Sequence, residues 1–206
     1  MAATTTKVGI CNLALTELRG NPISNFDSDL STEAKLCRAH YEHVREVVLE
    51  AKEWRFATRR LKLAAHVDTP AYGYKYQFKL PSDCLRVLSA SDKPNGKPEE
   101  DNNIDWEREE DFLLAITKVV YIRYTQNLAI TTKFSPGFVQ AMAVRLGAQM
   151  AVALTGSTKR RDQLLKDYDY MVSTGATKDG MQGKAKKRRP GRLELARRGG
   201  GNYYMT

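Results

Sequence analysis

This sequence of 206 residues is short of the features that mark secreted, disulfide-linked and membrane proteins. Its three cysteines are scattered and form no CxxC pair, so we expect buried free thiols in a reducing compartment. The opening residues, MAATTTKVG, contain no apolar run of the kind found in a secretory signal. The longest apolar run, 138–154, is interrupted by Arg145 and Gln149, which predicts a buried core helix and no contact with a membrane.

Signatures of catalysis and of metal binding are also missing. The sequence contains no HExxH, GxSxG or GxGxxG pattern, and the GSTK stretch at 156–159 lacks the order of a phosphate-binding loop. Cys37, His40 and His43 share one predicted helix, but they fan across about 120° of it and do not converge on a tetrahedral ion. The sequence therefore predicts that the protein is not an enzyme, and it assigns no catalytic, metal-binding or cofactor-binding residue.

Positive charge is present in excess, and most of it lies at the C-terminal end. Residues 177–206 hold nine Lys or Arg against Asp179 and Glu194, a net charge of +7 out of +9 for the chain. This stretch is rich in Gly and almost without apolar residues before its last two tyrosines, so we expect it to be disordered or ordered only by a partner.

We call residues 176–206 the basic arm. It is a candidate for a nucleic-acid grip, a localisation signal or a partner-docking peptide, and contacts to phosphate need only dense Lys and Arg. Sequence readout is not expected, because aromatic side chains for base stacking come only at its end. The candidate docking residues of the arm are Lys184, Lys186, Lys187, Arg188, Arg189, Arg192, Arg197, Arg198, Tyr203 and Tyr204.

Negative charge gathers in a second segment, 99–111, whose net charge of −7 is equal and opposite to that of residues 177–206. Three interpretations stay open: a solvated loop and strand edge, a site for Ca²⁺ or Mg²⁺, or a surface between subunits that docks a basic segment such as the arm of a neighbouring copy. The acidic residues are Glu99, Glu100, Asp101, Asp105, Glu107, Glu109, Glu110 and Asp111.

Helical periodicity marks both ends of the chain. It predicts helices from about residue 8 to 18 after an N-cap at Thr6, from Ser31 to Trp54, from Ser135-Pro136 to Leu154, and from Ser157 to a stop at Gly175. The third of these is apolar nearly all round, so we expect it at the centre. Its glycine and alanines, which allow neighbouring helices to approach closely, are Gly147, Ala141, Ala143, Ala148 and Ala151.

The middle of the chain alternates with the period of strands. We expect strands at 72–80, 84–88 and 119–125, and shorter ones near 104–106 and 112–115. The predicted class is thus α+β: mainly a helical bundle of about four helices, with an inserted small antiparallel β domain and an extended basic C-terminal arm. The predicted order is 1–58 for the first half of the bundle, 59–130 for the β domain, 131–175 for the second half of the bundle and 176–206 for the arm.

Three stretches in a fixed order resemble a known family. They are WRFATRRLKLA at 54–64, YKYQFKLPSDCLRV at 74–87, and YIRY at 121–124 followed by FSPGF at 134–138 and the Ala-rich helix. With LTEL at 15–18, they are similar to the head-to-tail adaptors of tailed bacteriophages of the tail tubular protein A type, over most of residues 7–175.

The resemblance implies a ring of about twelve copies beneath the portal protein, which extends the DNA channel toward the tail. It implies as partners the portal, other copies of the chain and a downstream tail or nozzle protein, and as location the neck of a virion assembled in the bacterial host cytoplasm. C-terminal segments of relatives dock on the portal, although this arm is unusually basic and Gly-rich. The alternative is a non-specific DNA-binding protein that uses the arm on phosphates.

Overall fold

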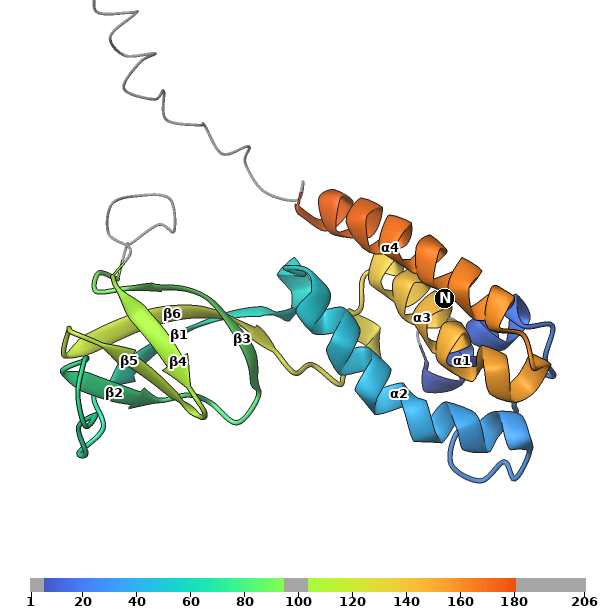
Figure 1. Ribbon diagram of the computed structural model, residues 1–206, viewed down its shortest axis with the longest axis horizontal. Helices are drawn as coiled ribbons and strands as arrows, with labels where there is room; N and C mark the ends of the chain where they lie inside the picture. The colour runs from blue at the N-terminus through green and yellow to red at the C-terminus, as the bar shows by residue number, and fades with distance from the viewer. Residues whose placement is uncertain (1–5, 95–103, 181–206) are drawn as a thin grey trace, which may run out of the picture.

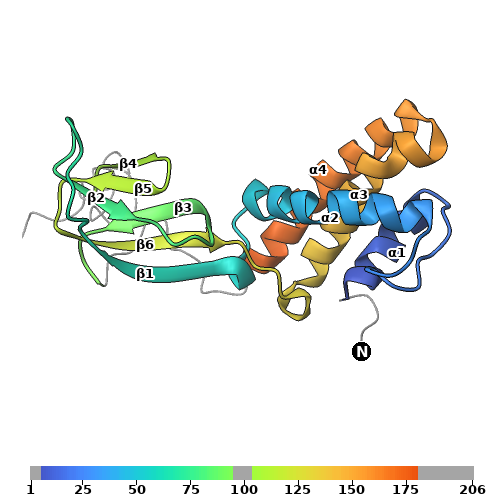
Figure 2. The same ribbon diagram turned by 90° about the horizontal axis from the view of Figure 1, so that it is seen from below.

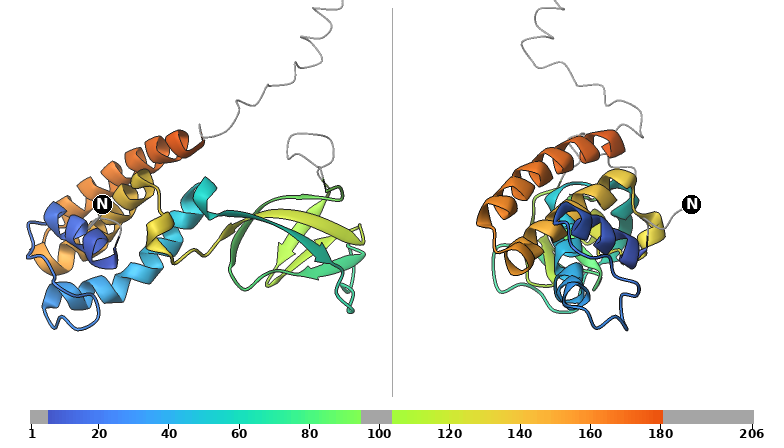
Figure 3. Two further views of the ribbon diagram at one scale, coloured as in Figure 1. Left: turned by 180° about the vertical axis from the view of Figure 1, so that it is seen from behind. Right: turned by 90° about the vertical axis from the view of Figure 1, so that its right-hand side faces the viewer.

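The computed structural model describes residues 6–94 and 104–180, which form an α+β protein of four α-helices and two antiparallel sheets. The helices are α1 (Lys7–Glu17), α2 (Thr32–Ala51), α3 (Pro136–Thr155) and α4 (Thr158–Gly180). The strands are β1 (Thr58–Ala64), β2 (Tyr76–Lys79), β3 (Cys84–Ser91), β4 (Trp106–Glu109), β5 (Phe112–Ala115) and β6 (Val119–Gln126). Figures 1 and 3 show the helices gathered at one end of the molecule, the helical part, and the strands at the other, the β part.

The helices begin where short polar side chains cap them. The hydroxyl oxygens of Thr6, Ser31 and Ser135 each accept a hydrogen bond from the backbone N–H three residues further on, and Ser157 does the same ahead of α4. These bonds satisfy N–H groups that have no partner within a helix. The predicted starts of all four helices are confirmed.

Two predicted helix ends are wrong. The second helix ends at Ala51 because Lys52 is extended, and Trp54 turns back so that its indole N–H donates to the carbonyl of Val48 at 2.8 Å. The fourth helix does not stop at Gly175 but continues to Gly180, so residues 176–180 are helical. Glycine weakens a helix by about 1 kcal/mol, but it caps one where it takes a left-handed conformation, as Gly156 does at the end of α3 with φ 66°.

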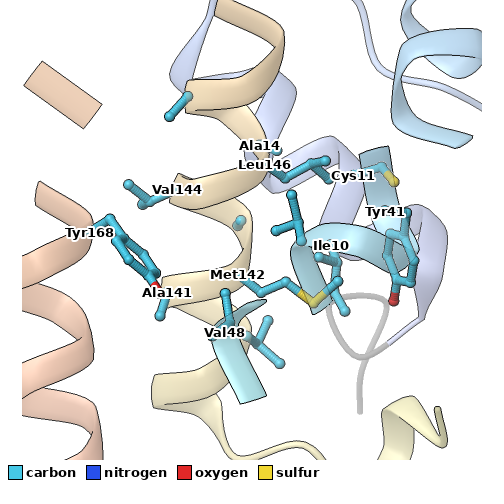
Figure 4. Close-up of a cluster of buried hydrophobic side chains, with 14 of the residues drawn as sticks. Ile10, Cys11, Ala14, Tyr41, Val48, Ala141, Met142, Val144, Leu146 and Tyr168 are labelled. Carbon is cyan, nitrogen blue, oxygen red and sulfur yellow. The ribbon is translucent and has the colours of Figure 1, made fainter. Parts of the chain in front are cut away.

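The helical part is built around α3, as its apolar sequence predicts. Figure 4 shows Met142 and Leu146 directed toward α1 and α2, while Val144 lies toward Tyr168 of α4. Gly147 lies where α1 comes closest, because a Cβ atom there would stand 3.2 Å from the carbonyl oxygen of Ala14. The alanines predicted to allow this packing are all buried: Ala141, Ala143, Ala148 and Ala151.

The β part is a small sandwich. Sheet A has the strand order β1-β6-β3 and sheet B the order β2-β5-β4. Alternate residues of both sheets point inward, where they form a second core, separate from that of the helices. Its buried members are Leu63, Phe78, Leu80, Cys84, Val87, Ala90, Leu113, Ala115, Val120, Ile122 and Tyr124.

Three of the predicted strands are confirmed, those at 84–88, 112–115 and 119–125, although β3 continues to Ser91. The strand β4 begins at Trp106, later than predicted. The strand predicted for 72–80 is wrong in its first half: Tyr72 is 88% exposed, Gly73 has φ 82°, and only Tyr76–Lys79 pairs. The sequence analysis did not identify β1 as a strand.

Polar contacts join the helical part and the β part where the chain passes between them. Arg45 of α2, which is buried, donates to the side chain of Asn127 and, at 2.9 Å, to the carbonyl oxygen of Leu128, just after β6. Where the chain passes from α2 to β1, the carboxylate of Glu53 forms an ion pair with Arg123 of β6 at 2.8 Å. The β part is therefore held in place by charged hydrogen bonds, which are stronger than neutral ones.

Candidate interaction surfaces

Many of the residues proposed from the sequence lie outside the described part of the chain. None of the ten docking residues of the basic arm is described, nor are the first three acidic residues of 99–111. The arm residues are Lys184, Lys186, Lys187, Arg188, Arg189, Arg192, Arg197, Arg198, Tyr203 and Tyr204, and the acidic ones are Glu99, Glu100 and Asp101. The other five acidic residues lie in and beside β4.

The strand β4 forms one edge of sheet B. Trp106 pairs with buried Ala115 and Arg108 with buried Leu113, so these two side chains take the core side of the sheet. Glu107 and Glu109 alternate with them and take the opposite side, where both are exposed. The strand thus places two carboxylates on one side, with the remaining acidic residues before and after them.

Most of these carboxylates have no counter-ion within the described residues. Asp111 pairs with Lys79 at 3.0 Å. The nearby cation of Arg108 is used elsewhere, because its Nη1 donates to the carbonyl oxygen of Leu85 across the sandwich at 2.6 Å. No ion pair within 6–94 and 104–180 reaches the four others, which we call the acidic edge: Asp105, Glu107, Glu109 and Glu110.

The negative charge of the acidic edge acts on the phenol of Tyr74. Partial burial raises the pKa of the Tyr74 phenol above its usual value of 10.0. The carboxylates of Asp105, Glu107 and Glu109 raise this pKa further, because a nearby negative charge disfavours the phenolate. Three of the acidic side chains therefore act together on one neighbouring group.

The outer face of sheet A has the opposite charge. In the strand register Arg60 of β1 stands opposite Arg123 of β6, and Arg86 of β3 stands opposite Thr125 of β6. These positions alternate with members of the β core, so their side chains take the outer side of sheet A, where Thr125 itself is buried. Lys62 lies on the same face, with its ammonium 5.9 Å from the ring centre of Tyr121.

Only one of these cations is neutralised within the described chain. Arg123 pairs with Glu53, whereas Arg60, Lys62 and Arg86 are exposed and form no ion pair with any residue of 6–94 or 104–180. We call these three residues the basic face. Figure 2 shows β1 and β4 on opposite sides of the β part, so the basic face and the acidic edge are separated.

The sequence analysis missed the basic face, although a signal was present. Arg60 and Lys62 are two residues apart, and Leu61 and Leu63 alternate with them, which is the period of a strand. The sequence analysis also gave no role to Asp83. Its carboxylate accepts hydrogen bonds from Tyr124 at 3.1 Å and Gln126 at 2.9 Å, and so fixes the start of β3 on β6.

The groups considered for metal binding do not converge. Cys37 is buried, while His43 of the same helix is exposed. A hydrogen bond with the Cys37 thiol and burial raise the pKa of the Cys11 thiol, and both cysteines are free. Among the described residues no group of three or more His, Cys, Asp or Glu is placed to hold a metal ion.

Of the described helices, only α3 is long and apolar enough to cross a membrane, and most of it is buried inside the protein, as in the core helix of a folded domain. Comparison with protein-family models finds no match for this chain, and comparison with curated proteins finds none either. The described surfaces can form non-covalent contacts through charge, which is positive on the basic face and negative on the acidic edge.

Proposed function

We propose that this chain is a structural head-to-tail connector of a tailed phage, and not an enzyme. It forms a ring under the portal protein, extends the DNA channel and provides the surface to which the tail attaches. The observation that carries this proposal is the position of the family-like segments. Residues 54–64 and 134–138 lie at the two crossings between the helical part and the β part and in the neighbouring β1 and start of α3, and residues 74–87 include β2 and the start of β3.

Two of these segments build one cluster although about 70 residues separate them. The ring of Trp54 lies 5.2 Å from that of Phe138, and Phe56 lies 5.8 Å from Phe134. Phe134 and Phe138 lie 4.7 Å apart at the start of α3. Segments that carry the resemblance thus pack together at the base of the helical part, which supports a shared architecture: a bundle of four helices with an inserted β domain.

The surfaces of the β part also suit a subunit of a ring. A closed ring is built from heterologous contacts, in which two different surfaces of each subunit meet. The acidic edge and the basic face are two such surfaces on opposite sides. The partners we propose are the portal, other copies of the chain, a downstream tail or nozzle protein and, non-specifically, genomic DNA, in the neck of a virion assembled in the host cytoplasm.

The basic arm docks on the portal or on neighbouring subunits in this proposal. The test is a chain cut after Gly180, which keeps all of α4, mixed with purified rings of the cognate portal protein. We expect the thermal unfolding of the shortened chain to match that of the full chain and its attachment to the portal to be weaker. A chain whose residues 181–206 are scrambled in order is the control for charge alone. Attachment of the shortened chain at full strength would contradict the role of the arm.

A second function, non-specific DNA binding, is favoured by the net charge of +7 on residues 177–206. It predicts that the isolated chain binds duplex DNA, with an affinity that falls about 10³-fold or more between 50 and 200 mM salt if about six phosphates are contacted. The connector proposal predicts weak binding that does not compete with attachment to the portal.

A further inference from the structure

We propose that the basic face of one copy of this chain binds the acidic edge of the next copy. This inference rests on the proposed function, because it assigns the contact between neighbouring subunits of the ring. It concerns the folded β part alone, whereas the sequence suggested the arm as the partner of the acidic segment.

The first argument is the charge left unmatched on sheet A. Arg60 and Arg123 stand opposite each other on neighbouring strands, and like charges in such positions destabilise a sheet. Glu53 neutralises Arg123 only. The basic face therefore keeps three cations without a counter-ion in the described chain, an arrangement that an external anionic surface would stabilise.

The second argument is that the molecule carries a matching anionic surface. The acidic edge has four carboxylates without a counter-ion among the described residues, and the side chain of Arg108, which lies within it, is already bound to Leu85. Opposite charges spread over two surfaces steer association and fix its register, while contacts between like surfaces are disfavoured. A second copy of the chain presents the complement that each surface needs.

The third argument is geometric. The strands β1 and β4 lie on opposite sides of the β part, so one chain cannot join its own two surfaces (Figure 2). When the basic face of one copy binds the acidic edge of the next, a row of copies has a free basic face at one end and a free acidic edge at the other. These two ends meet in a closed ring if the rotation between neighbouring copies allows it.

Compared with the arm, the basic face is the better partner for the acidic edge. Its cations are held on paired strands, so binding costs little conformational entropy of the backbone. The contact is between exposed charges, and the Debye length is about 8 Å at physiological salt, so we expect it to weaken as salt is raised.

The test uses full-length chains with reversed charge. One variant changes the basic face (Arg60→Glu, Lys62→Glu, Arg86→Glu), and the other changes the acidic edge (Asp105→Lys, Glu107→Lys, Glu109→Lys). Each variant alone presents two surfaces of like sign, so we expect its self-association, measured by sedimentation, to fall by about tenfold or more. An equimolar mixture presents opposite signs at every contact, and we expect it to regain the association of the original chain.

Carbodiimide coupling supplies a direct readout on the unchanged protein. Chains with and without isotope label are mixed and treated, and we expect a link from Lys62 of one chain to Glu107 or Glu109 of the other. Thermal unfolding of each variant checks its fold. The variant Lys75→Glu/Lys118→Glu alters exposed cations outside both surfaces, and its association should stay unchanged.

Absence of links between chains, failure of the mixture to recover, or links from the acidic edge to lysines of the arm would overturn the inference. So would a loss of duplex DNA binding in the basic-face variant without any loss of self-association. Failure of the proposed function is distinguishable: links between the two surfaces in a chain that never binds the portal contradict the connector only. Rings on the portal that form equally well from the basic-face variant contradict the inference only.

Discussion

Arg38 and Arg160 of the helical part bind backbone oxygens of their own chain, whereas most arginines on the outer face of sheet A have no ion pair within the described residues. In the helical part, Arg38 donates to the carbonyl oxygens of Phe26 and Asp29, and Arg160 to that of Glu17. On sheet A, Arg60 and Arg86 have no ion-pair partner within the described residues. These arginines of the helical part are used in its own packing, while the basic face and the acidic edge of the β part leave charges of opposite sign for contacts with other molecules.

The two parts also differ in their cores. The helical core surrounds α3 with three helices and includes fully buried aromatic rings such as Trp54 and Phe138. The β core lies between two three-stranded sheets and has fewer buried members than the helical core. We infer that stability comes mainly from the helical part and that the β part serves to present surfaces.

The largest expected effect is a loss of stability in the two cores, and it tests whether the helical core is the more tightly packed one. Leu146 of α3 and Leu113 of β5 are both fully buried, so Leu146→Ala and Leu113→Ala remove the same atoms. We expect losses within the range of about 2–5 kcal/mol, with the larger loss for Leu146→Ala because rigid helices on several sides cannot close the cavity. Urea unfolding followed by circular dichroism measures both. A larger loss for Leu113→Ala would show that the β part is the more tightly packed one.

The next effect concerns the junction. Arg45→Ala leaves the buried carbonyl oxygen of Leu128 without its donor, and we expect a loss of about 1–3 kcal/mol. Faster hydrogen exchange at residues 127 and 128 should accompany it, because the crossing to the β part is no longer held. Arg45→Lys, which keeps the charge, is the matched control and should recover part of the loss. Unchanged exchange in Arg45→Ala would mean that the crossing is fixed by other contacts.

Acid should act on the helical part through Asp29. Hydrogen bonds from Ser31 and Ser24 to its carboxylate lower the pKa of Asp29 to about 2. A lowered pKa contributes stability that is complete above the unfolded value of about 4 and is lost as the pH falls toward 2. We expect Asp29→Asn to be less stable at pH 6 and to lose less stability on acidification. Parallel urea midpoints of the two proteins between pH 6 and 2 would contradict this.

The smallest expected effect is a change in the pKa of Tyr74, which tests how close the acidic edge lies to this side chain. The variant Glu107→Lys/Glu109→Lys should lower the pKa of the Tyr74 phenol toward its usual value, because two of the charges that raise it are reversed. Absorbance titration, with Tyr74→Phe in each background subtracted to isolate this tyrosine, measures the change. A pKa that does not move would place the two glutamates too far from Tyr74 to act on it.

The sequence predicts best what depends on local chemistry. Caps at Thr6, Ser31 and Ser135 mark helix starts because a hydroxyl oxygen satisfies a free N–H wherever the helix lies. Gly147 was predicted to allow close approach of helices, and α1 does approach there. A helix that is apolar nearly all round is expected to be buried, so the central place of α3 could be predicted too.

The sequence predicts poorly what depends on pairing between distant strands. The residues of β1 are mostly exposed, so its signal in the sequence is limited to the short alternation at 60–63, and pairing with β6 is what makes it a strand. The basic face exists because pairing places Arg60 and Lys62 of β1 and Arg86 of β3 on the same outer face, on either side of β6. The acidic segment was visible in the sequence, but its single-sided exposure came from the register of β4 with β5.

The most direct test of the connector proposal is native mass measurement of the full chain with and without the cognate portal ring. The account predicts chains that assemble on the portal into one closed ring of about twelve copies, with a single dominant mass. A chain that leaves the portal mass unchanged at micromolar concentration, or that adds in variable numbers without closure, would contradict it.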